Sequence, residues 1–309
     1  ILPYFKKAEH NEVFDNDYHG QNGPLNVSKI RNQNTPTDDF VKTGSELFGF
    51  NEDFNGANQE GIGYYQTTQK DGKRCSTAKA YLVPALERDN LTVMTDTNVN
   101  KIIFESKKAI GVECLDKNGE LFVLNANKEV ILCSGAFGSP QILLRSGVGP
   151  SEEIVKHNIE HIHELPGVGK NLQDHIDFNF CFKTSDKNTL GISPKGLFKI
   201  LGETAKWFIH GNSMISSTLS EVGGFFKTDP SLDRPDIQNH FVIGLIDDHL
   251  RKIHYGYGYS CHVCLLRPYS RGRVSLASAK VSDDPIIDPN FFSDLRDLKT
   301  LIRGAKFTQ

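Results

Sequence analysis

The segment that most constrains the fold is residues 128–149, KEVILCSGAFGSPQILLRSGVG. Within it, residues 129–133 form a short, nearly unbroken apolar run. Such runs are typical of strands buried on both faces of a parallel sheet. Gly135 and Gly138 follow at once and indicate a turn. We therefore predict a buried strand that ends in a glycine turn.

A helix is predicted directly after this turn. Ser139 is a good N-cap residue, and Pro140 is the residue best tolerated at the first helical position. Residues 142–144 continue the helix, and Gly147 can end it. A strand, a glycine turn and a helix N-terminus in this order are typical of one edge of a nucleotide-binding sheet.

Length and charge limit the classes of protein to consider. A chain of 309 residues is long enough for about two domains with sizeable cores. The net charge of −3 argues against a general nucleic-acid surface, so we expect no nucleic-acid partner. No apolar run approaches the roughly 20 residues that span a bilayer, and no secretory signal is visible. Six cysteines spread over the chain suit reduced thiols, so we expect a cytoplasmic location.

Both ends of the sequence have helical character without the usual helix boundaries. Residues 1–9 resemble the tail of an amphipathic helix that lacks a start signal, and apolar residues keep a helical period from Leu295 to Ala305. From these patterns we expect the chain to be an internal piece of a longer polypeptide.

The remaining pattern predicts a mixed α/β (α+β) chain. A hairpin turn at Asn118-Gly119 joins two of the expected strands. The second half is dominated by strands and predicts an antiparallel sheet with helices on one face. Helices are expected at residues 37–48, 75–86, 151–155 and 197–209. Strands are expected at residues 91–94, 99–105, 109–115, 121–124, 178–182, 223–226, 237–242, 257–266 and 273–276.

Motifs for phosphate, metal or nucleophile chemistry are absent or weak. The chain has no GxGxxG loop, no GKS/T loop and no GxSxG elbow. Cys261 and Cys264 form a lone CxxC, and residues three apart on a strand point to opposite faces. His157, His161 and His163 lie where a helix is expected to end before a strand. We therefore expect no metal site at either group.

The opening segment resembles the second signature of the glucose–methanol–choline (GMC) oxidoreductases. That signature is a small pair, Ser/Thr-Pro, two aliphatic residues and Ser-Gly-aliphatic-Gly, and residues 135–149 meet every position. Similar family segments are LPGVGKNLQDH at residues 165–175, YHGQNGP at residues 18–24 and PYSRGRV at residues 268–274. The resemblance covers the whole chain and is closest to the branch of choline and aliphatic-alcohol dehydrogenases.

This resemblance implies a fold and a cofactor. Family members combine an FAD-binding domain of the glutathione-reductase type with a substrate domain built on an antiparallel sheet. By this resemblance Val99 matches the position whose backbone meets the adenine of FAD, and Gly135 matches a close approach to the nucleotide. The expected domain boundaries place substrate-domain and connecting segments at residues 1–75, part of the FAD-binding domain at 76–175, the substrate-binding domain at 176–287, and the start of a helix returning to the FAD-binding domain at 288–309.

The resemblance also implies a reaction, in which a primary alcohol, choline-like or aliphatic, gives a hydride to the flavin while a histidine removes the hydroxyl proton. A quinone or another acceptor would then reoxidise the flavin, and a peripheral membrane association of the full-length enzyme is compatible with the family. The pyrophosphate loop and the motif that bears the catalytic histidine have no match here. We therefore assign no catalytic residue, and expect this chain alone to be inactive and to bind FAD weakly or not at all.

Two other functions fit part of the sequence. One is a nicotinamide-dependent dehydrogenase, and the other is a truncated, non-catalytic binding or structural module. If the chain belongs to an alcohol-oxidising enzyme, the sheet would form a wall of the alcohol pocket. One member of each adjacent aromatic pair could then line a cavity, because alternate residues on a strand face opposite sides. The aromatic residues concerned are Phe178, Phe180, Phe225, Phe226, Phe241 and Tyr257.

Overall fold

The protein is represented by a computed structural model that describes residues 1–31, 34–211, 213–248, 251–252 and 254–309. The chain folds into two compact units, each built from segments that are distant in the sequence. Unit 1 comprises Ile1–Leu91, His175–Arg267 and Leu298–Gln309. Unit 2 comprises Thr92–Asp174 and Pro268–Asp297.

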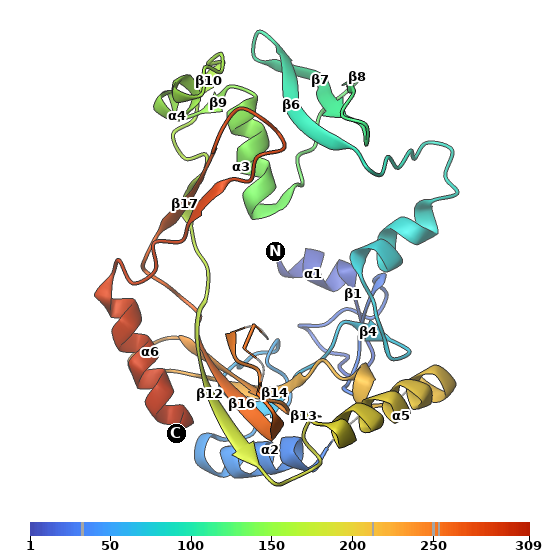
Figure 1. Ribbon diagram of the computed structural model, residues 1–309, viewed down its shortest axis with the longest axis vertical. Coiled ribbons are helices and arrows are strands. Elements are labelled where there is room, and N and C mark those ends of the chain that lie inside the picture. The colour runs from blue at the N-terminus through green and yellow to red at the C-terminus, as the bar shows by residue number, and fades with distance from the viewer. Residues whose placement is uncertain (32–33, 212, 249–250, 253) are drawn as a thin grey trace. The chain divides into compact units, whose positions relative to one another are not determined.

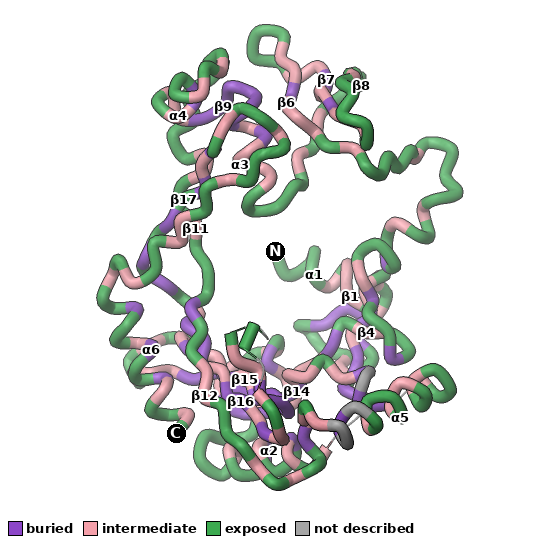
Figure 2. The backbone as a smooth tube through the Cα atoms, in the orientation of Figure 1, coloured by how far each residue is buried: buried purple, intermediate pink, exposed green. Residues whose placement is uncertain are grey.

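A mainly antiparallel six-stranded sheet forms the centre of unit 1 (Figure 1). Buried residues collect on its central strands (Figure 2), where Ile237 and Val263 are 0% exposed. The strands that the sequence predicted in this half of the chain are confirmed. In spatial order they are β12 (Ile176–Thr184), β16 (Gly256–Leu265), β15 (Ile237–Val242), β14 (Ser220–Phe226) and β3 (Gly61–Tyr64), and β13 (Gly191–Ile192) also pairs with β16.

Helices α2 (Thr35–Phe48) and α6 (Leu295–Thr308) pack on one face of this sheet, as predicted. The side chain of Asn34 caps α2 by accepting the N–H of Thr37 at 3.1 Å. After β13, α5 (Pro194–His210) begins with Ser193 as a side-chain cap and ends at Gly211, whose φ of +65° is the left-handed conformation glycine favours. α1 (Leu2–Ala8) is short and exposed.

Smaller elements complete unit 1. β1 (Glu9–Asn11) pairs with β2 (Leu25–Val27) in parallel, and β4 (Gln69–Lys70) and β5 (Lys73–Arg74) form a hairpin. The helix predicted at residues 75–86 is only a π-helical turn, Ala78–Leu82, followed by a 3-10 turn, Val83–Ala85. Pro84 has no N–H to donate, so a regular α-helical ladder is interrupted here.

Unit 2 combines a three-stranded meander with two helices. β6 (Asn98–Glu105), β7 (Lys108–Leu115) and β8 (Leu121–Asn125) are antiparallel neighbours, and the predicted turn at Asn118-Gly119 is confirmed. The helices are α3 (Gly135–Arg145) and α4 (Ser151–Lys156). The short strands of this unit are β9 (Val148–Gly149) with β10 (His163–Glu164), and β11 (Lys170–Leu172) with β17 (Gly272–Ser275) and β18 (Ile286–Asp288).

Two strands that were predicted from apolar runs are absent from the described residues. Residues 91–94 and 129–133 have no regular secondary structure. Their side chains lie largely in solvent, with Met94 48% and Ile131 74% exposed. A strand in a parallel sheet needs a neighbour to satisfy its backbone groups, and no described strand pairs with either segment.

The start of α3 is also corrected. The helix begins at Gly135, so Ser139 is no N-cap and Pro140 lies inside the helix. The hydroxyl of Ser139 instead accepts the N–H of Ser134 at 3.1 Å. Gly147, with φ +79°, follows the C-cap residue and ends the helix as predicted.

The two units divide the chain differently from the expected domains at four places. Residues 76–91 and His175 belong to unit 1, residues 268–287 belong to unit 2, and residues 298–309 belong to unit 1. The pairing of β17 with β11 holds residues 272–275 in unit 2. Contacts of Gly304 with Ile237 and Val263 hold the second half of α6 against the sheet of unit 1.

Candidate functional site

Three segments that carry the family resemblance meet in unit 2. One face of α3, the connector at residues 168–173 and Val274 line a single cavity of about 410 Å³. The α3 residues in this lining are Ala136, Ser139, Pro140 and Leu143. More than one hundred residues separate α3 from Val274 in the sequence, so only folding brings these segments together.

Backbone pairing and a small apolar core hold these segments in place. The N–H of Val274 donates to the carbonyl of Gly169 at 2.6 Å, next to the β11–β17 pairing. On the other side, Leu144 of α3 packs with Ile154 and Leu276, all at most 2% exposed. The packing of unit 2 therefore holds these three segments together.

The N-terminus of α3 offers hydrogen-bond donors. Its cap residue, Ser134, makes no side-chain capping bond, and residues 134–137 are exposed. Gly135 has φ +78°, and a Cβ there would meet no atom within 4 Å. First-turn N–H groups of a helix have no intrahelical partners and attract anionic or hydrogen-bond-accepting groups. These residues therefore fit a phosphate-bearing cofactor.

Val99 and Gly135, the two residues predicted to bind the cofactor, lie at opposite ends of α3. The guanidinium of Arg145, at the C-terminal end, donates to the carbonyl of Val99 at 3.4 Å and to that of Asn100 at 2.8 Å. Burial lowers the pKa of this guanidinium. Ten residues of helix, about 15 Å, separate Arg145 from Gly135. A dinucleotide bound in an extended form could span a helix of this length, and the role of Val99 and Gly135 in binding stays a prediction.

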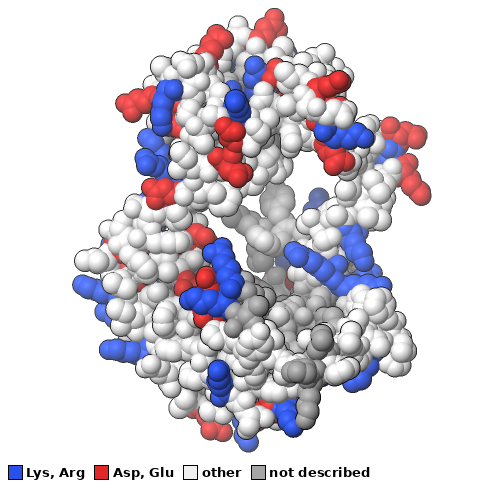
Figure 3. Space-filling model, viewed as in Figure 1, with Lys and Arg blue, Asp and Glu red and all other residues white. Residues whose placement is uncertain are grey.

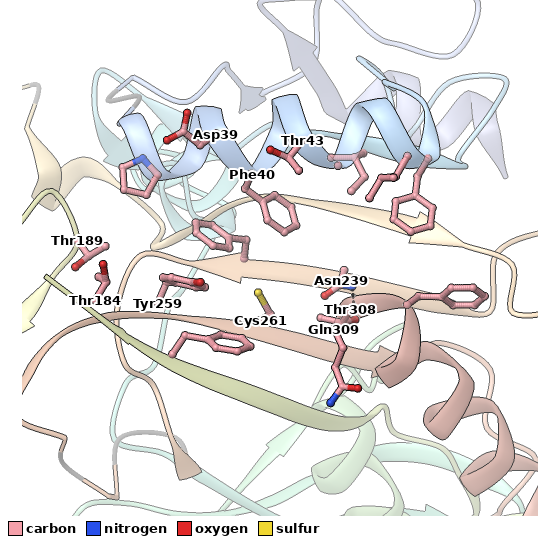
Figure 4. A pocket seen from close by; sticks show the side chains of 18 of the residues that line it. Asp39, Phe40, Thr43, Thr184, Thr189, Asn239, Tyr259, Cys261, Thr308 and Gln309 are labelled. Carbon is pink, nitrogen blue, oxygen red and sulfur yellow. Dashed lines mark hydrogen bonds between the residues drawn. The ribbon is translucent and has the colours of Figure 1, made fainter. Parts of the chain in front are cut away.

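In unit 1 the two faces of the central sheet differ in chemistry. One face is aromatic and is covered by α2 and α6 (Figure 4). There Phe241 stacks on Phe40 at 4.6 Å between ring centroids, and Phe226 packs on Phe48 at 4.8 Å. A cavity of about 550 Å³ remains between these rings, Tyr259 and the end of α6.

The predicted alternation of aromatic side chains is confirmed for one pair. Phe226 lines this cavity, whereas its neighbour Phe225 packs against Phe54 on the other face, with centroids 5.0 Å apart. Phe241 also lines the cavity, while Phe178, Phe180 and Tyr257 do not. Because the lining rings are paired with other rings, they act as packing residues of unit 1.

The opposite face of the sheet carries a polar row that crosses four neighbouring strands. His240 of β15 stands directly opposite His262 of β16. The Nδ1–H of His262 donates to the carboxylate of Asp177 on β12 at 2.7 Å, and Nδ1 of His240 lies 3.4 Å from the hydroxyl of Ser220 on β14. We call Asp177, His262, His240 and Ser220 the polar row.

The surroundings of the polar row favour an uncharged His240. Burial lowers the pKa of His240 most strongly; Asp177 raises it, and the nearby His262 and His175 lower it. Beside the row, half-buried Tyr65 donates its hydroxyl to the carbonyl of Asn239 at 2.6 Å and accepts from Gln238 at 3.3 Å. Burial raises the pKa of Tyr65 far above its usual value. This face therefore offers neutral groups that can exchange protons or hydrogen bonds.

The polar row was missed from the sequence, although a signal for it exists. His240 and His262 are 22 positions apart; His240 belongs to no motif, and His262 lies inside the lone CxxC without being part of its pattern. Antiparallel register, which the sequence does not specify, places them side by side. The alternation within residues 237–242 and 257–266 would have placed each histidine on the face opposite to Phe241 and Cys261.

A second missed cluster lies around His19, in the family-like segment at residues 18–24. His19 is 3% exposed, and its two ring nitrogens lie 3.1 Å from carboxylate oxygens of Glu9 and Asp53. The amide nitrogen of Asn11 also lies 2.9 Å from Nδ1 of His19, so the imidazole is held by polar groups at both ring nitrogens. Burial alone would raise the pKa of Glu9, but hydrogen bonds from Gly20, Asn11 and His19 hold it below its usual value. The cluster joins β1 to the loop that holds Asp53.

The residues considered as metal ligands are placed apart. Cys261 lines the aromatic cavity, whereas Cys264 lies near Tyr65 on the other face, which confirms the strand argument. His157 lies 3.5 Å from Glu153, and His161 lies 3.3 Å from Glu164. In the part of the chain that the structure describes, no group of three or more His, Cys, Asp or Glu side chains is arranged to hold a metal ion.

Comparison with known proteins gives matches over the whole chain. An alcohol dehydrogenase [acceptor] of Pseudomonas putida is 44% identical over 98% of this chain and 55% of that protein. The mitochondrial choline dehydrogenase of Mus musculus is 38% identical over 99% of this chain and 52% of that protein. The chain thus spans about half the length of these curated relatives.

Solved structures share the fold. Pyridoxine 4-oxidase from Mesorbium loti has a TM-score of 0.83 at 24% identity, over 99% of this chain and 57% of that one. A formate oxidase has a TM-score of 0.88 at 22% identity, over 99% of this chain and 59% of that one. The N-terminal GMC oxidoreductase family model matches residues 1–177, and the C-terminal model matches residues 268–309. With its converging signature segments, this chain belongs to the GMC oxidoreductase family.

Proposed function

We propose that the protein containing this chain oxidises a primary alcohol to the aldehyde with FAD as hydride acceptor. The observation that carries the proposal is the 44% identity, over 98% of the chain, to an alcohol dehydrogenase [acceptor]. The family match also favours the flavin over the nicotinamide alternative, because the GMC oxidoreductases are flavoproteins.

Unit 2 would contribute part of the FAD site. When bound, FAD supplies the group that accepts the hydride from the alcohol carbon. The open N–H groups at the start of α3 would meet a phosphate or another accepting group, and Gly135 leaves room for a close approach. At the other end of the helix, the backbone around Val99 would meet the adenine, with Arg145 fixing that strand.

Unit 1 would contribute a wall of the alcohol site. The aromatic face is packed against α2 and α6, so we propose that the polar face is the one that meets the substrate. Its hydrogen-bonding groups can orient a hydroxyl, and Tyr65 and Gln238 lie beside the polar row. We assign none of these residues as the catalytic base.

The proposed substrate is an uncharged primary alcohol rather than choline or a sugar. The alcohol dehydrogenase relative is 44% identical, compared with 38% for the choline dehydrogenase. On the polar face, the carboxylate of Asp177 is already bound to His262, so it is poorly available to balance a quaternary ammonium group.

The test is a steady-state assay of the full-length protein with an artificial electron acceptor. Medium-chain primary alcohols should have the highest kcat/KM, choline a lower one and glucose the lowest. Turnover of glucose far above that of the alcohols would refute the substrate assignment, and turnover that requires a nicotinamide cofactor would refute the cofactor.

A further inference from the structure

The aromatic cavity of unit 1 lies on the face of the central sheet opposite to the polar row. All of its lining residues belong to unit 1, and its volume of about 550 Å³ is within the range of about 300–1,000 Å³ that small-molecule sites have. Helices α2 and α6 cover it, and neither they nor any other described helix is long and apolar enough to cross a membrane. Leu47 of α2 lines the cavity and is 73% exposed, so the cavity is open to solvent beside this helix. A small molecule can therefore enter it.

Aromatic rings form a continuous row along one wall of this cavity. Phe40 of α2 stacks on Phe241 with ring centroids 4.6 Å apart, and the ring of Phe241 lies 5.4 Å from that of Tyr259. Tyr259 in turn stacks on Phe182 with centroids 5.2 Å apart. Aromatic rings attract one another at these separations, so a ligand ring in the cavity would extend the row. The wall therefore favours a flat aromatic ligand.

One buried polar group at the wall of the cavity has no partner. Asn239 of β15 lines the cavity and is 5% exposed, and no described residue donates a hydrogen bond to its buried Oδ1. Buried polar atoms without a partner are rare in folded proteins. Figure 4 shows Asn239 beside Thr308 and Gln309, at one end of the cavity. This end therefore favours a ligand that donates a hydrogen bond.

The hydrogen bonds of Thr308 establish which atom of Asn239 is left without a partner. The hydroxyl of Thr308 donates its single proton to the carbonyl of Gly304 at 3.1 Å, so toward Asn239 it can only accept. The side-chain N–H of Asn239 donates to this hydroxyl at 2.7 Å. Exchanging the amide nitrogen and oxygen would bring two acceptors together. The unpaired atom is therefore the oxygen, which needs a donor.

The charges at the cavity disfavour an anionic ligand. The visible face of the molecule carries side chains of both signs (Figure 3). By contrast, the described residues that line the cavity include two carboxylates, Asp39 and Asp186, but no Lys, Arg or His. An anion in the cavity would be repelled by these carboxylates without a cation to balance it. The ligand should therefore be uncharged.

We propose that the aromatic cavity binds an uncharged phenol, with its ring beside the aromatic row and its hydroxyl donating to Oδ1 of Asn239. A phenol meets all three requirements, because it is flat and aromatic, neutral at neutral pH and a hydrogen-bond donor. The carbon that bears the hydroxyl of a phenol has no hydrogen, so a phenol cannot be the hydride donor of the proposed oxidation. This inference therefore does not depend on the proposed function.

The experiment titrates the purified chain with three probes at neutral pH in an isothermal titration calorimeter. The first probe, para-propylphenol, should bind. The second, para-propylanisole, keeps the ring and the oxygen but has no proton to donate. It should bind about tenfold more weakly, because Oδ1 of Asn239 would stay unpaired. The third, para-propylbenzoate, is anionic and should not bind over the same range of concentration.

Variants test whether the probes occupy this cavity. Asn239→Leu has a similar volume but no acceptor, so it should bind both neutral probes and lose the tenfold preference for the phenol. Thr43→Phe fills the cavity from an exposed position on α2 and should weaken binding of both by at least about tenfold. Gln238→Leu is the matched control, since Gln238 is the neighbour of Asn239 on β15 and points to the opposite face, and it should keep the preference of the parent.

Four outcomes would overturn the proposal. The first is a parent chain that binds neither neutral probe, or both equally well. The second is a preference for the phenol that Gln238→Leu abolishes and Asn239→Leu keeps, because the phenol would then lie on the polar face. The third is unchanged binding by Thr43→Phe, which decides even if Asn239→Leu fails to fold. The fourth is binding by this chain that the full-length protein does not show, because another segment of the polypeptide would then fill the cavity.

Discussion

Two isoleucines, each in a segment that the sequence predicts as a strand, have opposite surroundings. Ile237, in the alternating segment at residues 237–242, is 0% exposed in the central sheet of unit 1. Ile131, in the run at residues 129–133 of unit 2, is 74% exposed and belongs to no strand. The first segment has paired neighbours on both edges, β14 and β16, and the second has none among the described strands. The hydrophobic pattern of a segment therefore indicates which side chains it can bury, while burial itself depends on the neighbouring strands.

The largest decrease in the free energy of unfolding is expected on removal of a buried carboxylate, Asp297, which anchors a loop of unit 2 by hydrogen bonds. Asp297 is 0% exposed and accepts the N–H groups of Tyr269 at 2.7 Å and Ser270 at 2.9 Å. Asp297→Ala leaves both N–H groups without this acceptor, that of buried Ser270 included, and should lower the free energy of unfolding by about 3 kcal/mol. Asp297→Asn keeps one strong acceptor and should cost about half as much. Urea unfolding followed by circular dichroism measures both, and equal costs for the two variants would contradict the anchor role.

A cavity in the central sheet should have an effect of nearly the same size. Ile237→Ala removes a fully buried side chain between β14 and β16 and should lower the free energy of unfolding by about 3 kcal/mol. Trp207 lies in unit 1, so its fluorescence in urea reports this unit directly. A cost below about 1 kcal/mol would mean that the sheet is packed much less tightly around Ile237 than its burial indicates.

The polar row should give unit 1 a pH dependence. Burial holds the pKa of His240 in the folded chain below 6.5, its value when exposed. In the window between these two values the unfolded chain binds more protons, so the free energy of unfolding rises with pH up to 6.5 and then levels off. His240→Gln should remove this slope, whereas His210→Gln, at an exposed helix end, should keep it. Urea unfolding at a series of pH values decides, and an unaltered slope in the His240 variant would exclude this residue as its source.

The smallest change in the free energy of unfolding is expected for a substitution in the exposed segment at residues 129–133. Ile131→Ala should change the free energy of unfolding of this chain by less than about 0.5 kcal/mol, because the side chain loses little contact. The same substitution at Ile237 is its matched partner. A cost at Ile131 similar to that at Ile237 would show that residues 129–133 are buried in solution, and the contrast between the two segments would disappear.

Local signals in the sequence predicted much of the fold. The hairpin at Asn118-Gly119, the end of α3 at Gly147 and the strands of the central sheet each depend on nearby residues or on simple alternation. The prediction of a strand at residues 129–133 was wrong because a strand needs a neighbouring strand to pair with. The local sequence does not show whether such a neighbour is present. The predicted start of α3 was wrong because Ser139 and Pro140, taken alone, suit the first residues of a helix. In the structure the helix already begins at Gly135, within the predicted glycine turn.

Only the parts of the candidate site that belong to recognised motifs could be predicted from the sequence. The family-like segments around α3 were recognised, and folding brings them to one cavity. The polar row and the His19 cluster were missed because they assemble from single residues on separate strands and loops. Strand register decides such neighbours, and a single sequence does not specify register between strands that are distant along the chain.

We propose above all that the protein containing this chain passes a hydride from a primary alcohol to FAD. The most direct measurement mixes the full-length protein with a medium-chain primary alcohol without oxygen and follows flavin absorbance. We expect a yellow protein whose oxidised-flavin absorbance is lost on mixing, with one aldehyde formed per flavin reduced. A flavin that stays oxidised with every primary alcohol tested, or a pure full-length protein without flavin, would contradict it.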